Sequence, residues 1–216
     1  MAKRRKVANL LALPLLALLV PGRPMHPYEM ATLLRRTGKE QAMEIKWGSL
    51  YTVVQNLEKH GYIAATETGR SGRRPERTRY AITDAGRAEL KDWLRELVGD
   101  PEEEHPRFEA ALSVVGVLPP DEVAALLEQR LQVLDTEIEA QRAALARVAT
   151  EVPRLFLIES EYALALRSAD AAWTRSLLAE LAAGSLPGMA EWRQWHQTGG
   201  TPPEWTRLME ETGMAD

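Results

Sequence analysis

The chain has no cysteine, few aromatic residues and no membrane-length hydrophobic run. Its 216 residues include no Cys, which excludes disulfides, thiol nucleophiles and cysteine-ligated metals. The four histidines (His26, His60, His105 and His196) are dispersed and show no metal-ligand spacing. The apolar stretch Leu10–Val20 is too short to cross a bilayer. With 45% hydrophobic and 27% charged residues, the composition indicates a soluble globular protein.

The sequence also lacks the patterns of an enzyme active site. It has no credible pair of catalytic carboxylates, no supported Ser/His/Asp order and no glycine-rich phosphate loop. Acidic neighbours such as Glu159 and Glu161 lie on a helical face, where the sequence indicates no basic or metal partner. We therefore predict that the protein is not an enzyme and uses no cofactor or metal.

The N-terminal segment has only part of the pattern of a signal peptide. Lys3–Lys6 is basic and Leu10–Val20 is apolar, but Pro21–Pro24 is not a small-x-small cleavage site. We interpret the apolar stretch as a buried first helix that Pro14 begins or kinks, in a cytoplasmic protein. The basic tetrad is interpreted as a flexible arm that touches DNA, and the alternative is a solvated tail without a role.

Two opposed stripes run along residues 45–63 at helical spacing. The apolar stripe, at i, i+3, i+4 and i+7, consists of Leu50, Val53, Val54 and Leu57. The polar stripe consists of Thr52, Gln55, Asn56 and Lys59. Ser49 as N-cap and Gly61 as C′ residue bound the helix. Amide, hydroxyl and ammonium groups can read base edges and phosphates, although such a helix taken alone is more often an ordinary surface helix.

Two further helices are predicted around this one. Pro27–Arg36 is expected to be helical, with Tyr28, Ala31 and Leu34 at apolar spacing. Thr83 or Asp84 is expected to cap a later helix that continues through Val98. The apolar stripe of that helix consists of Leu90, Trp93, Leu94 and Leu97.

A basic hairpin follows the polar-striped helix. Residues 62–68 and 77–83 are rich in β-branched and aromatic residues and are predicted to form two strands. Five arginines fall on the hairpin and its turn: Arg70, Arg73, Arg74, Arg77 and Arg79. A recognition-type helix followed by a basic hairpin is typical of a winged helix-turn-helix, whose helix enters the major groove while the wing follows phosphates or the minor groove.

The stretch from Met25 to Leu97 resembles the PadR family of bacterial transcriptional regulators. The matching pieces are Met25–Met30, Gly48–Tyr51, Leu57-Glu58, Gly61–Ile63, Arg74–Thr78, Tyr80, Thr83, Gly86, Leu90 and Trp93-Leu94. The chain departs from the family pattern at Pro27, where Gly is more common, and at Ser49–Thr52, where Thr-Leu-Tyr-Pro is more common. These departures concern the operator sequence rather than the DNA-binding role.

We predict a homodimeric repressor that binds a pseudo-palindromic operator. The polar stripe is expected to face the major groove, and Ser49 and Tyr51 to contact phosphates at the helix entry. The predicted DNA-binding residues are Ser49, Tyr51, Thr52, Gln55, Asn56, Lys59, Arg70, Arg73 and Arg74. The family resemblance implies release by a small molecule, often phenolic or drug-like. The alternative function is a winged helix that binds protein instead of DNA, against which the five arginines argue.

Charge and helical pattern divide the chain, whose net charge is −4. Basic residues exceed acidic ones in residues 1–98, and the reverse holds in 99–216, so only the first part is expected to meet a polyanion. The segment 99–106 is acidic and bracketed by proline, as linkers often are. We therefore predict a mainly α protein, with a winged helix-turn-helix DNA-binding domain over 1–98 and an all-α dimerisation domain over 107–216.

Two long helices are expected in the second domain, over Asp121–Glu151 and Pro153–Ala183. The break at Val152-Pro153 predicts an antiparallel hairpin. The apolar stripes persist for about four heptads, more than a lone hairpin needs, so we expect a partner chain to cover them. The alternative is an intramolecular bundle with the C-terminal tail. The residues predicted to mediate dimerisation, as the PadR resemblance also implies, are Leu127, Leu131, Leu134, Ile138, Leu166 and Trp173.

Tryptophan residues provide the remaining predictions. Trp93 and Trp173 are expected to line an apolar cleft for a small aromatic effector, and the alternative is that both are core residues. Trp192, Trp195 and Trp205 either line a pocket for a flat ligand or fasten a terminal helix to the bundle, and we favour the second interpretation.

Overall fold

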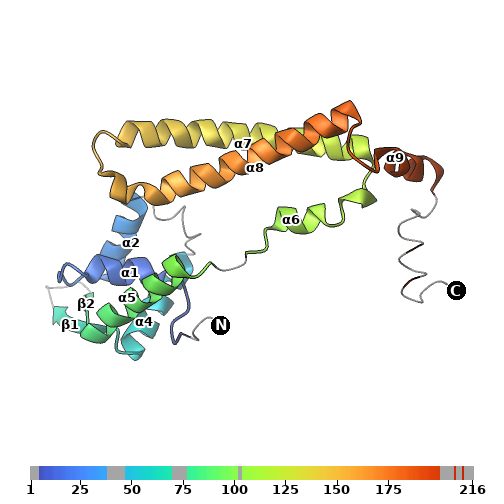
Figure 1. Ribbon diagram of the computed structural model, residues 1–216. Helices are drawn as coiled ribbons and strands as arrows, with labels where there is room; N and C mark the ends of the chain where they lie inside the picture. The colour runs from blue at the N-terminus through green and yellow to red at the C-terminus, as the bar shows by residue number, and fades with distance from the viewer. Residues whose placement is uncertain are drawn as a thin grey trace. The chain divides into compact units, whose positions relative to one another are not determined.

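The computed structural model describes residues 5–37, 47–69, 77–101 and 104–199, together with residues 207 and 211. The chain forms two compact units, Met1–Glu104 and His105–Asp216, and the division falls within the segment 99–106. The protein is mainly helical, as predicted, with a small two-stranded sheet (Figure 1). None of the helices in the described ranges has the length and apolarity needed to span a bilayer.

Within the described residues, the first unit packs four helices and a hairpin around one core. Its helices are α1 (Ala12–Leu19), α2 (Pro27–Arg36), α4 (Leu50–Lys59) and α5 (Asp84–Gly99), with the 3₁₀ turn η1 (Trp47–Ser49) before α4. Strands β1 (Ile63–Gly69) and β2 (Arg77–Ile82) pair antiparallel, close to the predicted bounds. The largest fully buried side chains of this core are Leu15, Leu16, Leu19, Met30, Leu34, Leu50, Val54, Leu57 and Ile63.

Helix α1 confirms the predicted buried first helix. Pro14 lies in its first turn, where the missing N–H leaves no hydrogen bond unmade. Asn9 precedes the helix, and its Oδ1 accepts a hydrogen bond of 2.9 Å from the backbone of Leu11. The middle of the apolar stretch is therefore core, since Leu15, Leu16 and Leu19 are each 1% exposed, whereas the end residues Leu10 and Val20 are exposed.

At Arg5 the interpretation of the basic tetrad as an arm or a solvated tail is wrong, while Lys3 and Arg4 lie outside the described residues. Its side chain is 4% exposed, with Nη1 lying 2.8 Å from Glu89 and 3.3 Å from Asp92, and it also pairs with Glu96. The guanidinium lies 5.2 Å from the ring centroid of Trp93. Burial alone would lower the pKa of Arg5, but hydrogen bonds and charge from Glu89 and Glu96 raise it. Arg5 thus fastens the N-terminal segment to α5.

Helix α2 occupies the predicted residues but buries a different face. His26 accepts a bond of 3.1 Å from the Tyr28 backbone, and Glu29 accepts one of 2.8 Å from the His26 backbone, so both ends of a capping box form. The buried residues are Pro27, Met30 and Leu34. Tyr28, predicted on the apolar side, is 67% exposed because the buried stripe begins one residue earlier.

Helix α5 is capped as predicted, but its apolar stripe is only half covered. Thr83 Oγ1 accepts a 3.0 Å bond from the Gly86 backbone, and Leu90 and Trp93 are buried. Leu94 and Leu97 are 44% and 38% exposed. The reason is length, since α1 has 8 residues and cannot cover all 16 residues of α5.

The second unit is built on a long helical hairpin, as predicted. Helices α7 (Pro120–Val148) and α8 (Ile158–Ala183) run antiparallel and side by side (Figure 1). Shorter elements flank them: α6 (Arg107–Leu112), η2 (Val115–Val117), η3 (Arg154–Phe156) and α9 (Met189–Thr198). The second long helix begins later than predicted, because Pro153 leads into the 3₁₀ turn η3 and not directly into the helix.

The contacts of Trp192 and Glu161 bear on two predictions for this unit. Trp192 Nε1 donates to the carbonyl oxygens of Gly116 and Leu118, at 3.0 and 2.9 Å, so this indole fastens α9 as favoured from the sequence. Trp205 lies outside the described residues. The expectation that Glu161 lacks a basic partner is wrong, because Arg154 Nη2 lies 2.9 Å from its Oε2. Hydrogen bonding to Arg154 lowers the pKa of Glu161.

Candidate nucleic-acid interface

Helix α4 separates its two faces as the stripes predict. Leu50, Val53 and Val54 are each 2% exposed, and Leu57 is 1% exposed, within the core of the first unit. The polar stripe is exposed over its whole length: Thr52, Gln55, Asn56 and Lys59. The core therefore fixes the helix while its amide, hydroxyl and ammonium groups stay accessible to base edges.

The entry to α4 differs from the prediction. Ser49 has a helical backbone (φ −89°, ψ −10°) and its side chain makes no capping hydrogen bond. A capping side chain needs an extended backbone, and the preceding turn η1 removes that geometry. Tyr51, in the first turn of α4, is 55% exposed. Its hydroxyl is therefore available for a phosphate, whereas Ser49 is half-buried.

The exit from α4 is tightly built and confirms the prediction for Gly61. This residue has φ +72°, a conformation that favours glycine. The backbone N–H groups of Gly61 and Tyr62 donate to the carbonyls of Glu58 (2.8 Å) and Leu57 (2.9 Å), which are the paired bonds of a Schellman motif. The chain thus turns directly from the helix into β1.

The hairpin is tied to both helices of the helix-turn-helix. The Tyr80 hydroxyl on β2 donates to Glu58 Oε2 of α4 at 3.3 Å, and burial together with Glu58 raises the pKa of Tyr80. Arg79 Nη2 lies 2.9 Å from Glu29 Oε1, and its Nη1 donates to the Pro24 carbonyl at 3.3 Å. Arg79 therefore holds the hairpin against the start of α2.

The wing arginines fall mostly beyond what the structure describes. Arg70, Arg73 and Arg74 lie outside the described residues, and Arg77 is described only as the first residue of β2. Tyr28 is 67% exposed on α2 and was not among the residues predicted to bind DNA. The first helix of a helix-turn-helix crosses the DNA backbone, where a tyrosine hydroxyl can reach a phosphate. The sequence held no signal for this exposure, because the apolar spacing of Tyr28 and Leu34 placed Tyr28 on the buried side.

The predicted dimerisation residues divide into two groups. Leu127, Leu134 and Ile138 are buried within the hairpin of the single chain, with Leu131 packed beside them. Leu166 and Trp173 are 54% and 48% exposed. The first group therefore supports the hairpin, and the second group is available to a partner.

The two tryptophans predicted to bind an effector belong to different units. Trp93 is 5% exposed in the core of the first unit, under Arg5. Trp173 lies on α8 with its ring centroid 6.0 Å from that of Phe108. Only Trp173 exposes a substantial part of its indole. Within the described ranges, no group of acidic and histidine side chains is arranged to hold a metal.

These observations define a winged helix-turn-helix protein with a helical second unit. Residues 15–92 match the Transcriptional regulator PadR-like family. Over these residues the chain is similar to the PadR-like family, which is a family of transcriptional regulators. A search among curated proteins finds no match to the chain.

Solved structures share the fold. The chain is similar to PadR of Bacillus subtilis in complex with operator DNA, with 21% identity, a TM-score of 0.66, and coverage of 80% of this chain and 99% of that chain. The same protein with p-coumaric acid gives 20% identity, a TM-score of 0.65, and coverage of 79% and 98%. The structure of the Vibrio cholerae virulence activator AphA is 19% identical, has a TM-score of 0.59, and the match covers 80% of this chain and 98% of that chain. The likeness extends beyond the winged domain into the helical unit.

Proposed function

We propose that the protein is a homodimeric repressor that binds a pseudo-palindromic DNA operator in the cytoplasm. The carrying observation is helix α4, whose apolar face is buried while every member of its polar stripe is exposed. In this proposal residues 1–98 form the DNA-binding domain, 99–106 the linker and 107–216 the dimerisation domain. The PadR-like family and the operator complex of the Bacillus subtilis protein support it.

The proposed interface combines base reading with phosphate contacts. Thr52, Gln55, Asn56 and Lys59 face the major groove. Ser49 and Tyr51 meet phosphates at the entry of α4. Arg70, Arg73 and Arg74 act in the wing. The excess of basic residues in 1–98 supplies the attraction that a polyanion requires.

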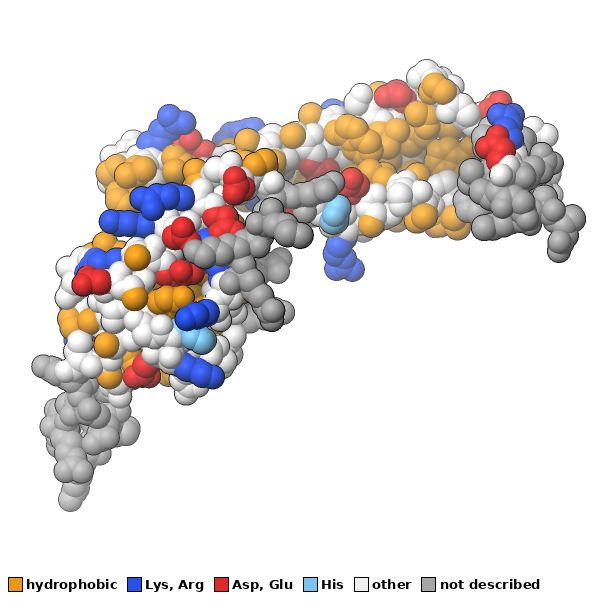
Figure 2. All heavy atoms as spheres, turned by 60° about the horizontal axis from the view of Figure 1, so that its bottom comes forward, with side chains coloured by type: hydrophobic (Ala, Val, Ile, Leu, Met, Phe, Trp, Pro, Cys, Tyr) orange, Lys and Arg blue, Asp and Glu red, His pale blue; other side chains and the backbone are white. Residues whose placement is uncertain are grey.

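The proposed dimer interface lies on α8. We define the α8 stripe as Ile158, Tyr162, Leu166 and Trp173, which share one side of the helix at i, i+4, i+8 and i+15. Their exposed fractions are 52%, 67%, 54% and 48%. Figure 2 shows hydrophobic side chains gathered on the hairpin surface. Large contiguous apolar surfaces are rare on monomers, and a two-fold partner presenting the same stripe would cover this one.

Footprinting of the DNA upstream of the protein's own gene tests the main proposal. We expect a protected region with two-fold symmetry, and an affinity that falls steeply as salt rises, because phosphate contacts release counterions. A winged helix that binds protein instead would show no salt-dependent protection of any duplex. That outcome would refute the proposed repressor function and favour the alternative, a winged helix that binds protein.

Asn56→Ala is expected to cost roughly 1–3 kcal/mol of operator binding and to relax sequence preference, because a bidentate amide contact to adenine would be lost. Asn56 is exposed at the centre of the polar stripe, so the substitution should leave folding unchanged. Titration of operator and scrambled duplexes measures the effect. Gln197→Ala, which removes an exposed amide on α9, is the control. Unchanged discrimination by Asn56→Ala would refute the role of the stripe.

We also propose that a small aromatic compound releases the protein from DNA. The support is the p-coumaric acid complex of the Bacillus subtilis protein and the accessible indole of Trp173. By linkage, a compound that weakens DNA binding must bind the DNA-bound form less tightly.

With p-coumaric acid as the first probe, we expect tryptophan quenching and loss of operator affinity over one concentration range. Trp173→Leu should blunt both responses. Trp93→Ala is a poorer variant, because removing a buried indole also costs core stability. Absence of quenching and of any change in affinity across a panel of aromatic acids would refute release by an effector.

A further inference from the structure

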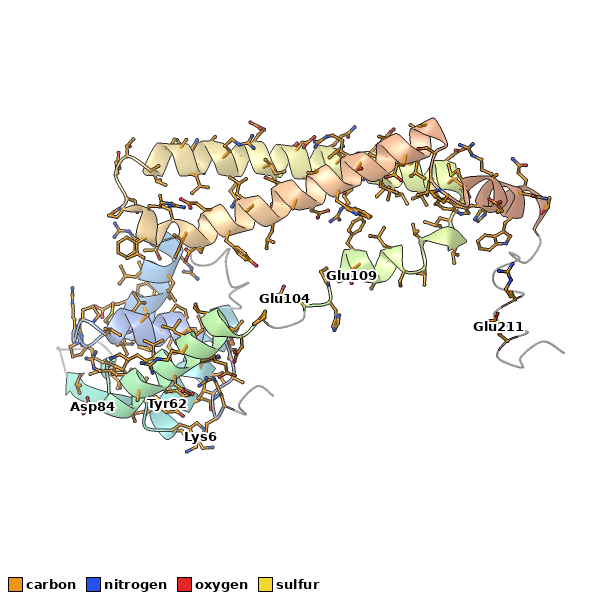
Figure 3. All side chains as sticks on the ribbon, in the orientation of Figure 1. Lys6, Tyr62, Asp84, Glu104, Glu109 and Glu211 are labelled. Atoms are coloured by element: carbon orange, nitrogen blue, oxygen red, sulfur yellow. The ribbon has the colours of Figure 1, made fainter. Side chains whose placement is uncertain are left out.

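The segment that leads into the helical hairpin is held at few points. We call residues 107–118, which contain α6 and η2, the strap. Neither α6 nor η2 contains a buried residue. Figure 3 shows α6 as a short helix at Glu109, following the extended chain at Glu104. Segments with few buried contacts open locally at low cost, so the strap depends on its individual anchors.

Phe108 is the first anchor. The Arg130 guanidinium of α7 lies 3.6 Å from the ring centroid of Phe108. Trp173 of α8 meets the same ring edge-on, at 6.0 Å and 83°. Cation–π and edge-to-face contacts are both specific to an aromatic ring. Phe108 is therefore gripped by both long helices at once.

The site that receives Phe108 is preformed. Arg130 makes an ion pair with Asp170 of α8. The Thr174 hydroxyl, in a side chain with 0% exposure, donates to Asp170 Oδ1 at 3.4 Å. These contacts hold the guanidinium in place without using Phe108, so removing the ring should leave the hairpin intact.

The second anchor lies at the other end of the strap. The Gly116 carbonyl accepts hydrogen bonds from Trp192 Nε1 (3.0 Å) and lies 2.9 Å from His196 Nε2. Trp192 also reaches the Leu118 carbonyl at 2.9 Å. Val115 and Leu118, at this end of the strap, also pack against the core that contains Val123 and Leu127. Between Phe108 and Val115, Val114 is 62% exposed. Loss of Phe108 would thus free the strap as far as Val115.

We propose that Phe108 determines which operator half-site spacings the protein accepts, an inference that rests on the proposed dimeric DNA-binding function. Helix α5 ends at Gly99, so the chain joining it to the first anchor is residues 100–107. That stretch reaches at most about 30 Å when fully extended. If the first anchor moved from Phe108 to Val115, the available reach would roughly double.

A longer tether changes binding in two measurable ways. The effective concentration of the second half-site falls with about the −3/2 power of tether length, so doubling the length lowers it about threefold. The same slack lets the two winged domains reach half-sites that a short tether excludes. Removal of the anchor should therefore weaken the preferred operator slightly and strengthen the others relative to it.

The test compares Phe108→Ala with the parent on operators whose half-sites are moved apart by about half and about one helical turn, roughly 5 and 10 base pairs. We expect Phe108→Ala to bind the native spacing about threefold more weakly and to discriminate at least about tenfold less against the altered spacings. Val114→Ala, which trims an exposed side chain of the same strap, should behave as the parent. Phe108→Tyr keeps the ring and should restore discrimination.

Amide hydrogen exchange supplies a readout without DNA. In Phe108→Ala, protection within α6 should fall while α7 and α8 keep theirs. Phe108→Leu, which retains apolar volume but lacks a ring, decides the question if the alanine variant loses its fold. Unchanged α6 protection, or faster exchange in α6 with the parent's spacing profile, would overturn the proposal. Failure of the parent to bind any operator would overturn the proposed function as well.

Discussion

Leu166→Glu is expected to convert the protein from a dimer to a monomer and to weaken operator binding about 100-fold or more. Leu166 lies at the centre of the α8 stripe and is 54% exposed in the single chain. A carboxylate there meets water in the monomer, so the hairpin itself should fold. In the dimer the same carboxylate would be buried without a partner, which costs several kcal/mol. Without a linked second domain, the avidity gain of about 10²–10⁴ is lost.

Sedimentation at micromolar concentration and operator titration measure the two effects separately. Ala179→Glu is the matched control, because it adds the same charge to α8 at an exposed position that lies about 140° around the helix from Leu166. We expect Ala179→Glu to remain dimeric and to bind the operator as the parent does. The monomeric variant should still bind a single half-site weakly. A Leu166→Glu protein that sediments as a dimer would place the interface elsewhere.

Local sequence chemistry was enough to predict most of the winged domain. Pro27 follows the cap of α2, Gly61 ends α4, and Thr83 caps α5, and each contacts groups within a few residues along the chain. Such signals depend only on neighbours, so they survive without knowledge of the tertiary fold. The two stripes of α4 were equally clear in the sequence, because its apolar and polar residues fall on opposite faces of a short helix.

The predictions that failed depended on partners distant in the sequence. Arg5 meets Glu89, Asp92 and Glu96 on a helix that begins almost eighty residues later. Nothing near the basic tetrad indicates those carboxylates. The prediction that Ser49 caps α4 failed for a local reason, because the preceding 3₁₀ turn gives Ser49 a helical backbone. The prediction that Tyr28 is on the apolar side failed because two apolar spacings, which start one residue apart, fit the same segment equally well.

The predicted dimerisation residues show what helical periodicity cannot reveal. Leu134 and Leu166 have the same helical spacing to their neighbours, yet Leu134 is 8% exposed and Leu166 is 54% exposed. Periodicity reports that a face is apolar but does not distinguish burial within the hairpin from burial against a second chain. The described wing residues show the same limit, because Arg79 belongs to an arginine-rich hairpin but pairs with Glu29.

Gly86→Ala is expected to destabilise the winged domain by about 3 kcal/mol, at the upper end of the usual cost of overpacking. A Cβ at this position would lie 2.0 Å from the Tyr62 carbonyl oxygen and 3.0 Å from Ile82 Cγ1. The carbonyl cannot easily retreat, because it also accepts hydrogen bonds of 3.1 Å from both the backbone and the hydroxyl of Thr83. The methyl group would therefore push α5 away from the hairpin.

Thermal and denaturant unfolding measure this prediction, with an expected loss of at least about 12 °C in the midpoint of the winged domain. Gly99→Ala is the control, since it adds the same methyl group to the same helix where nothing lies within 4 Å. Alanine favours helix over glycine, so this variant should be unchanged or more stable by up to about 1 kcal/mol. Gly86 packs α5 against Tyr62 and Ile82 of the hairpin, which follows α4 directly, so its substitution should also weaken operator binding. Equal unfolding midpoints for the two variants would show that α5 and the hairpin are not close-packed at Gly86.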